Sequence, residues 1–196
     1  MPGLLEILPD RVRLPMTFDA AALAADLGAF DESDWTAHFV RDNYEGEWSA
    51  LPLRAAAGET HKLRMIFANP TASVFADTPF LGRAPAIRAA LARFECPLKA
   101  VRLMRLAAGS VIKEHDDFDP DAASGTARLH VPITTGPEVE FLLNRKPVPM
   151  APGEVWYLRL ADPHSVANRG TRDRVHLVID TWTNAWLEAL LRAGAR

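Results

Sequence analysis

The sequence of 196 residues lacks several features that mark particular classes of protein. It contains one cysteine, Cys96, so an intramolecular disulfide is impossible and a zinc site built on cysteine thiolates is excluded. No apolar run approaches the roughly 18 residues that a membrane span needs, and the first residues have no basic segment followed by a long apolar one. The sequence therefore predicts a cytoplasmic protein that is neither secreted nor inserted into a membrane.

A strong charge of either sign is also missing. The formal net charge is −3, and although arginine greatly outnumbers lysine, the arginines are spread along the chain. This argues against a general nucleic-acid binder. With 48% hydrophobic and 24% charged residues, the chain has the composition of an ordinary globular protein and the length of one domain. We expect a small molecule or a peptide as the partner, and the sequence does not indicate the oligomeric state.

Residues 1–98 mix helical and extended patterns, and we expect them to form an α/β scaffold. Asp19 is a suitable N-cap for a first helix that ends near Gly28, and Pro85 is suited to the start of a second. The runs 47–53 and 63–67 are typical of strands. The apolar residues that repeat at helical spacing are Leu23, Leu27 and Phe30 in the first helix, and Ile87, Leu91 and Phe94 in the second.

Residues 99–183 contain short strand-like runs in series, which favours a mainly β fold with flanking helices, and a jelly roll fits this pattern best. Turn signals separate the runs, and Pro152-Gly153 suits the centre of a type II turn. Residues 184–196 predict a closing helix, with Thr183 as a possible cap. The expected strands are 101–106, 111–115, 128–133, 139–143, 155–158 and 174–181.

His115, Asp117 and His164 are candidate metal ligands. Side chains alternate between the faces of a strand, so His115 and Asp117 can converge on one point, and a distant strand can bring His164 there. Two imidazoles and one carboxylate leave coordination positions open, as non-heme Fe(II) oxygenases require. Asp116 and Asp119 are alternative carboxylates, although strand parity favours Asp117. An ordinary strand end in a solvated, acid-rich loop is the competing interpretation.

Arg174 opens an apolar strand-like run and would point to the same side as His176. A buried guanidinium needs an anionic partner. This partner is either a protein acid such as Asp173 or Asp180, or a dicarboxylate cosubstrate, whose carboxylate matches the planar fork of arginine. Placement at an exposed strand end is a third possibility.

Arg128 and His130 lie two residues apart and share one face of a predicted strand. Polar residues that face the interior of a barrel usually serve a site. The alternative is that this face is the outer one. Trp156 and Trp182 are expected to be core or rim aromatics without a chemical role.

From about residue 101 to 182 the chain resembles the aspartyl/asparaginyl β-hydroxylase family of Fe(II)- and 2-oxoglutarate-dependent dioxygenases. The resemblance implies a double-stranded β-helix of the cupin type. It also implies iron on His115, Asp117 and His164, and 2-oxoglutarate on Arg174 with help from Arg128 and His130. The motifs that carry it are His115-Asp116-Asp117-Phe118, Arg128-Leu129-His130, Pro152-Gly153-Glu154-Val155-Trp156, and His164-Ser165 with Arg174 ten positions later.

At the His-x-Asp element the chain resembles the bacterial free-proline hydroxylases, which keep the carboxylate, and not the animal peptidyl aspartyl hydroxylases, which lack it. This resemblance favours a small amino acid or its derivative as the substrate and does not imply proline itself. Arg105 resembles an arginine of the free-proline hydroxylases and is a candidate substrate residue. The resemblance implies hydroxylation of an unactivated C–H bond in an amino acid, an amino-acid derivative or a peptidyl Asp/Asn-type residue, using dioxygen and releasing succinate and carbon dioxide. The alternatives are a cupin-like hydrolase or isomerase with another divalent metal, and a cupin-like module that binds a small acid or metal without turnover.

Overall fold

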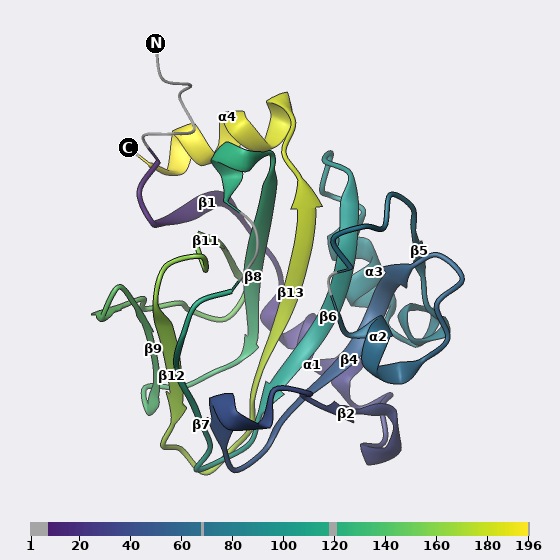
Figure 1. Cartoon of the computed structure of the whole chain (residues 1–196), viewed down its shortest axis with the longest axis vertical. Coiled ribbons are helices and arrows are strands. Elements are labelled where there is room, and N and C mark those ends of the chain that lie inside the picture. The colour runs from purple at the N-terminus through teal and green to yellow at the C-terminus, as the bar shows by residue number, and fades with distance from the viewer. Residues whose placement is uncertain (1–7, 68, 118–120, 196) are drawn as a thin grey trace.

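The computed structural model describes residues 8–67, 69–117 and 121–195, and it is built around two antiparallel sheets that face each other (Figure 1). The larger sheet contains β1 (Arg11–Thr17), β2 (Thr36–Ala37), β4 (Trp48–Ala56), β5 (Phe75–Asp77), β6 (Leu98–Leu106), β8 (Thr126–Thr134), β11 (Glu154–Leu158) and β13 (Arg174–Trp182). The smaller sheet contains β3 (Tyr44–Glu45), β7 (Val111–His115), β9 (Val139–Leu143), β10 (Lys146–Pro147) and β12 (His164–Asn168).

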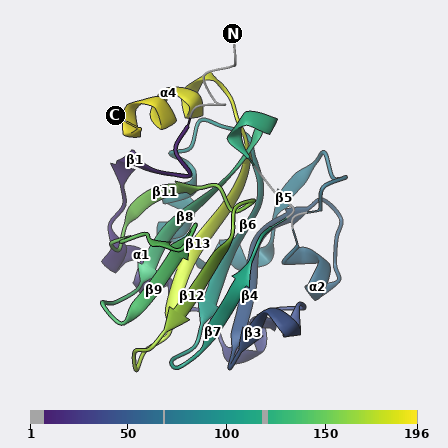
Figure 2. The same cartoon turned by 60° about the vertical axis from the view of Figure 1, so that its left-hand side comes forward.

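The strand order follows the double-stranded β-helix. The larger sheet runs β1-β11-β8-β13-β6-β4-β2, with β5 paired to β4, and the smaller runs β10-β9-β12-β7-β3. Figure 2 shows the smaller sheet in front of the larger one. Consecutive strands alternate between the two sheets along much of the second half of the chain, so the expected jelly-roll fold is confirmed. Most strands of residues 1–98 join the larger sheet, where β1 pairs with β11 and β4 pairs with β6, whereas β3 pairs with β7 in the smaller sheet.

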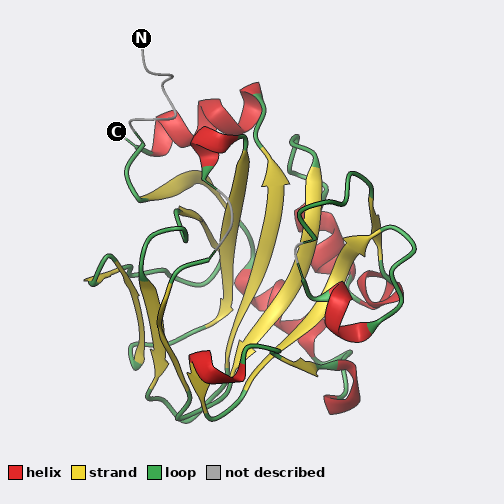
Figure 3. Cartoon of the chain, in the orientation of Figure 1, coloured by secondary structure: helices red, strands yellow, loops and turns green. Residues whose placement is uncertain are grey.

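Helices lie at the periphery of the sheets (Figure 3). The described α-helices are α1 (Ala20–Leu27), α2 (Lys62–Met65), α3 (Pro85–Leu91) and α4 (Ala185–Gly194), and the short 3-10 helices are η2 (Glu32–Asp34), η3 (Arg41–Asn43), η4 (Pro79–Arg83) and η5 (Ala122–Ser124). The expected start of α1 is confirmed, since the Asp19 carboxylate accepts from the backbone N–H groups of Ala21 and Ala22. Pro85 begins α3 as expected.

Two apolar cores follow from the alternation of side chains along the strands. On β13, Val175, Leu177 and Ile179 face outward and pack with α1, α3 and α4. The intervening positions face the space between the two sheets, where Leu106, Phe141 and other apolar residues form the second core. The candidate polar residues of β13 and β8 lie in these inward-facing positions, so the expectation of an interior polar face is confirmed by the register.

Phe30 and Phe94, which were expected on the two helices, lie just beyond the ends of α1 and α3. Two further local expectations are wrong. The run 63–67 is not a strand, because Lys62–Met65 forms α2 after a turn in which the Glu59 carboxylate accepts from Thr60 N and His61 N. A short apolar run does not distinguish strand from helix by its periodicity. The cap of α4 is Asn184 rather than Thr183, since the Asn184 side chain accepts from Leu187 N at 3.0 Å. No helix among the described residues is long and apolar enough to cross a membrane.

Candidate metal centre

His115, Asp117 and His164 meet at one point between the sheets. His115 ends β7 and His164 begins β12, and the two are direct partners in the antiparallel register. Their ring centroids are 4.3 Å apart, and the ligand atoms of all three residues lie within 4.8 Å of one another. His164 is buried, whereas His115 and Asp117 are half-buried. The structure thus brings together three side chains that are up to 49 positions apart in the sequence.

Backbone carbonyls fix the tautomer of both imidazoles. His115 Nδ1 lies 2.7 Å from the carbonyl oxygen of Lys113, and His164 Nδ1 lies 3.0 Å from that of Asp162. A carbonyl only accepts, so each Nδ1 carries the proton and each Nε2 keeps a free lone pair. Burial also lowers the pKa of His164, which favours the neutral form. Both rings therefore present the atom that binds a metal, oriented by a bond to the other nitrogen.

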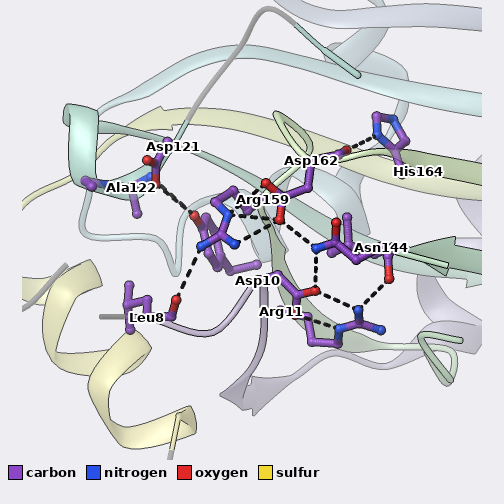
Figure 4. Close-up of polar contacts among 12 residues, drawn as sticks. Leu8, Asp10, Arg11, Asp121, Ala122, Asn144, Arg159, Asp162 and His164 are labelled. Carbon is purple, nitrogen blue, oxygen red and sulfur yellow. Dashed lines mark hydrogen bonds and ion pairs between the residues drawn. The ribbon is translucent and has the colours of Figure 1, made fainter. Parts of the chain in front are cut away.

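The loop that positions His164 is held by a polar network on the side of Asp162 (Figure 4). The Asp162 carboxylate accepts from Arg159 Nη2 at 2.8 Å and from Asn144 Nδ2 at 2.7 Å. Asn144 Nδ2 also donates to Asp10, 2.8 Å away. This network joins the segment before β1, the β9–β10 turn and the β11–β12 loop. It holds Asp162 in place, and the Asp162 carbonyl orients His164.

Asp117 is held from two sides. Its backbone N–H donates to the carbonyl of Leu160 at 2.8 Å, and its carboxylate accepts from Nη1 of Arg128. The other carboxylate oxygen lies 3.7 Å from Nε2 of His115. Asp116, the first alternative, is exposed and does not belong to the three-residue group. Asp119 and Phe118 lie outside the described residues.

Arg128 belongs to a buried network of charged side chains. Its Nε donates to Asp180 at 2.6 Å, and Arg102 donates to the other oxygen of the same carboxylate at 2.8 Å. Burial by itself would raise the pKa of Asp180, but the two guanidiniums outweigh it and hold the pKa below its usual range. Arg128 therefore links the carboxylate of Asp117 to a structural acid in the barrel interior.

Arg174 is a buried cation without a carboxylate partner among the described residues. It is 3% exposed, and burial lowers its pKa to about 9. Its Nη2 lies 2.8 Å from Nδ1 of His176, and its Nε has no hydrogen-bond partner in the described part of the chain. Asp180, one of the acids expected as an alternative partner, is bound by Arg102 and Arg128 instead. Arg174 is buried, so its placement at an exposed strand end, the third possibility, is wrong.

His130 and Phe141 connect Arg174 with the three-residue group. The Phe141 ring stacks on His164, with centroids 6.3 Å apart, and the guanidinium carbon of Arg174 lies 5.8 Å from the Phe141 centroid. The His130 centroid is 6.0 Å from that of Phe141, and its Nδ1 lies 3.3 Å from Nδ1 of His176. Nε2 of His130 is buried and unpartnered within the described residues. A line of polar and aromatic side chains thus leads from the candidate metal ligands to the unneutralised guanidinium.

These observations fit an iron ion and a dicarboxylate. Two neutral imidazoles and one carboxylate are the donor set of mononuclear non-heme iron sites, and three ligands leave positions open. The buried, unpartnered Nε of Arg174 is a donor within the described residues, and it fits a ligand that carries oxygen atoms. A carboxylate placed there would neutralise the cationic charge of Arg174.

Other candidate residues lie away from this line. Arg105 is on the outer face of β6, where its guanidinium forms a bidentate pair with Glu32 at 2.6 and 2.7 Å and lies over the ring of Trp35. This position does not support a role in substrate binding. Trp156 Nε1 donates to Glu154, and Trp182 packs against Phe75, as expected for core and rim aromatics.

The sequence interpretation missed Arg102, His176 and Asp180 as members of the site. Each is an ionisable residue within an apolar strand run, at the parity of the inward face. An ionisable residue at an inward position of an apolar strand was the sequence pattern that could have identified these three residues. Asp180 was considered only as a partner of Arg174, whereas it pairs with two other arginines.

The turn at Pro152-Gly153 precedes β11 and requires a glycine. Gly153 has a φ of 81°, the left-handed value that a type II turn requires. A Cβ at this position would lie 2.2 Å from the carbonyl oxygen of Phe18, whose own N–H donates to the Gly153 carbonyl. Glycine therefore allows β11 to start close to the segment before α1.

Comparison with known proteins agrees with the geometry. The chain is 28% identical over 177 residues to an L-proline cis-4-hydroxylase of Rhizobium meliloti (strain 1021), an alignment that covers 89% of this chain but 61% of that protein. The chain thus spans less than two thirds of the length of this relative.

Two solved structures share the fold. One is a non-heme monooxygenase, ThoJ, in complex with nickel, with a TM-score of 0.51, 18% identity, and coverage of 89% of this chain and 74% of that one. The other is a prolyl-4-hydroxylase of Pseudomonas putida, with a TM-score of 0.51, 13% identity, and coverage of 92% and 96%. The family profile of aspartyl/asparaginyl β-hydroxylases matches residues 19–184. The chain therefore belongs to the aspartyl/asparaginyl β-hydroxylase family.

Proposed function

We propose that this protein is an Fe(II)- and 2-oxoglutarate-dependent hydroxylase that acts on an amino acid, an amino-acid derivative or a peptidyl residue of the Asp/Asn type. The observation that carries the proposal is the pairing of an open three-ligand centre with a buried arginine that has no carboxylate partner among the described residues. Membership of the family and the proline hydroxylase relative support the same reaction class.

In this proposal His115, Asp117 and His164 hold the iron through two Nε2 atoms and a carboxylate oxygen. Iron bound there supplies the oxidative chemistry, in which dioxygen oxidises 2-oxoglutarate to succinate and carbon dioxide and one oxygen atom enters a C–H bond of the substrate. The Lys113 and Asp162 carbonyls keep both imidazoles in the ligating tautomer. Arg128 fixes the rotamer of Asp117 and neutralises part of its charge.

Arg174 binds the carboxylate of 2-oxoglutarate that is remote from the metal, and His176 orients the guanidinium through the acceptor nitrogen Nδ1. His130 lies beside Phe141 and His176 and completes the wall of the cosubstrate site. Phe141 supplies an apolar wall that keeps water from the buried cation. These residues orient the cosubstrate, so that only its keto-acid end reaches the centre.

The proposal is tested by product analysis. Purified protein is incubated with Fe(II), ascorbate and 2-oxoglutarate, together with free amino acids, short peptides and a cell extract, and the products are analysed by mass spectrometry. The expected result is a product that is one oxygen atom heavier than its substrate and that requires both iron and 2-oxoglutarate. Metal-dependent binding of 2-oxoglutarate without any oxidised product or succinate would instead favour a binding module, and product formed without dioxygen would favour a hydrolase or isomerase.

A further inference from the structure

Four ring side chains form a continuous strip that leads from solvent to the metal centre: Phe67, Phe39, His38 and Trp48, called here the aromatic strip. Ring centroids are 5.6 Å apart between Phe67 and Phe39, 4.7 Å between Phe39 and His38, and 3.5 Å between His38 and Trp48. The Trp48 ring lies 6.3 Å from that of His115. The strip thus ends at one of the candidate metal ligands.

The outer end of the strip is open and the inner end is buried. Phe39 and Phe67 are 45% and 46% exposed, whereas Trp48 is 7% exposed. Single exposed apolar side chains are ordinary, but these two rings contact each other and form one apolar surface. Contiguous apolar surface beside a site is typical of places where ligands bind. The exposure of the outer pair, joined to a buried end at the metal centre, is the geometry of an entrance wall.

The inner end of the strip is held in place before any ligand arrives. The His38 N–H donates to the Trp48 carbonyl at 2.8 Å, where β2 meets β4. Tyr44 on β3 sets its ring edge against Trp48, with an interplanar angle of 89°, and its hydroxyl donates to the carbonyl of His38 at 3.1 Å. Two strands and the segment between them therefore fix the stack of His38 and Trp48, which lowers the ordering cost of binding.

Two buried polar atoms of the strip lack a partner within the described residues. They are Nε1 of Trp48 and Nδ1 of His38. The remaining unpartnered atoms found there belong to His130 and Arg174, on the cosubstrate side. An indole N–H only donates, so Trp48 is suited to an oxygen acceptor on a ligand. Buried polar groups are usually paired, so these two atoms are available to a ligand that brings its own hydrogen-bonding atoms.

We propose that the aromatic strip is the substrate-binding wall and that it selects amino-acid substrates carrying a flat apolar group over small free amino acids. The inference rests on the proposed hydroxylase function and names the substrate class of the same site. The flat group lies against Phe39 and Phe67, and a carboxylate or carbonyl oxygen of the substrate accepts from Nε1 of Trp48. The substrate is then anchored beside His115.

Binding of two matched probes tests this inference. N-acetyl-L-phenylalanine and N-acetyl-L-alanine share the same carboxylate and amide and differ only in the ring. Their affinities are measured by saturation-transfer NMR on the full chain, loaded with Zn(II) in place of iron and with 2-oxoglutarate. The expected result is that the phenylalanine probe binds about fivefold or more tightly than the alanine probe.

Variants separate the two ends of the strip. Phe39→Ala and Phe67→Ala are each expected to weaken the phenylalanine probe by about two- to tenfold and to leave the alanine probe and 2-oxoglutarate unchanged. Trp48→Phe keeps a ring but removes the N–H, so it is expected to weaken both probes. Val74→Ala is the control, because Val74 is 64% exposed and takes no part in the strip.

Equal affinity for the two probes would overturn the inference. It would also be overturned if Phe39→Ala changed the oligomeric state in sedimentation without weakening either probe, which would assign the strip to contact between copies of the chain. Succinate formation with Fe(II) in the same preparations keeps the two proposals apart. Succinate formation without probe selectivity would contradict only the proposal for the aromatic strip. Probe selectivity without succinate formation would contradict the hydroxylase proposal and leave the strip as a binding site.

Discussion

Arg128 donates from Nε to Oδ1 of Asp180 over 2.6 Å, with both side chains inside the barrel and away from solvent. The other oxygen of this carboxylate accepts from Arg102, so one acid stabilises two buried guanidiniums. We predict that Asp180→Asn lowers the free energy of unfolding by about 3–5 kcal/mol, because it leaves buried cations without their anion. Urea unfolding of the metal-free protein measures this change.

The control for that prediction is Asp77→Asn. Asp77 also pairs with an arginine, Arg54, but its side chain is 56% exposed. Exposed pairs contribute at most about 1 kcal/mol, so this variant is expected to unfold almost as the parent does. If the two substitutions cost the same, the burial of the Asp180 network does not matter for stability.

Arg174 is predicted to cost stability and to serve binding. Arg174→Leu removes a buried charge that has no carboxylate partner among the described residues, so the free energy of unfolding is expected to stay the same or rise. The same change is expected to weaken 2-oxoglutarate binding by about 2–5 kcal/mol, measured by calorimetry on metal-loaded protein. Arg105→Leu is the matched control, since Arg105 pairs with Glu32 on the outer face. Undiminished binding by Arg174→Leu would remove this residue from the cosubstrate site.

Asn144 is predicted to support the metal centre from a distance. Its φ of 50° lies in the left-handed region, and its amide nitrogen donates to both Asp10 and Asp162. Asn144→Ala loses the hydrogen bonds and adds backbone strain, so a destabilisation of about 1–3 kcal/mol is expected. Asn144→Gly loses only the hydrogen bonds and is expected to unfold between the parent and the alanine variant. Both are expected to weaken zinc binding, because Asp162 orients His164; unaltered zinc affinity would show that this network is not needed there.

Stability is predicted to fall in mild acid. Burial lowers the pKa of His38 to about 4 and holds the pKa of His130 and His176 well below 6.5. Between pH 6.5 and pH 4 the unfolded chain therefore binds more protons than the folded one, and the free energy of unfolding decreases as the pH drops. Urea titrations of metal-free protein at several pH values measure the slope. His38→Gln is expected to lower the number of protons taken up on unfolding by about one, and so to reduce the slope. A free energy of unfolding that does not change with pH in the parent would contradict the burial of neutral histidines.

Much of this architecture could be predicted because local chemistry and tertiary contacts agree. Strands 111–115 and 139–143 carry clear strand residues and begin and end where expected. The start of α1 follows from one capping carboxylate, that of Asp19. The convergence of His115 with His164 needed only strand alternation and a partner strand, and the register supplies both.

Other features depend on contacts that a sequence does not show. β1 was missed because Pro15 weakens its strand pattern, and such a proline is tolerated since β1 is an edge strand. Whether Arg128 faced a ligand or an acid depended on the placement of Asp180 on a strand 52 positions later. His38 gave no signal at all, because its role follows from stacking on Trp48.

Succinate formation tests the central claim most directly. Purified protein with Fe(II), ascorbate, dioxygen and 2-oxoglutarate is expected to release succinate slowly even without substrate, and the His164→Ala variant and the iron-free protein are expected to release none. Succinate formation that persists in His164→Ala, or its complete absence from the iron-loaded parent with every substrate of the screen, would contradict the assignment of the His115, Asp117 and His164 centre.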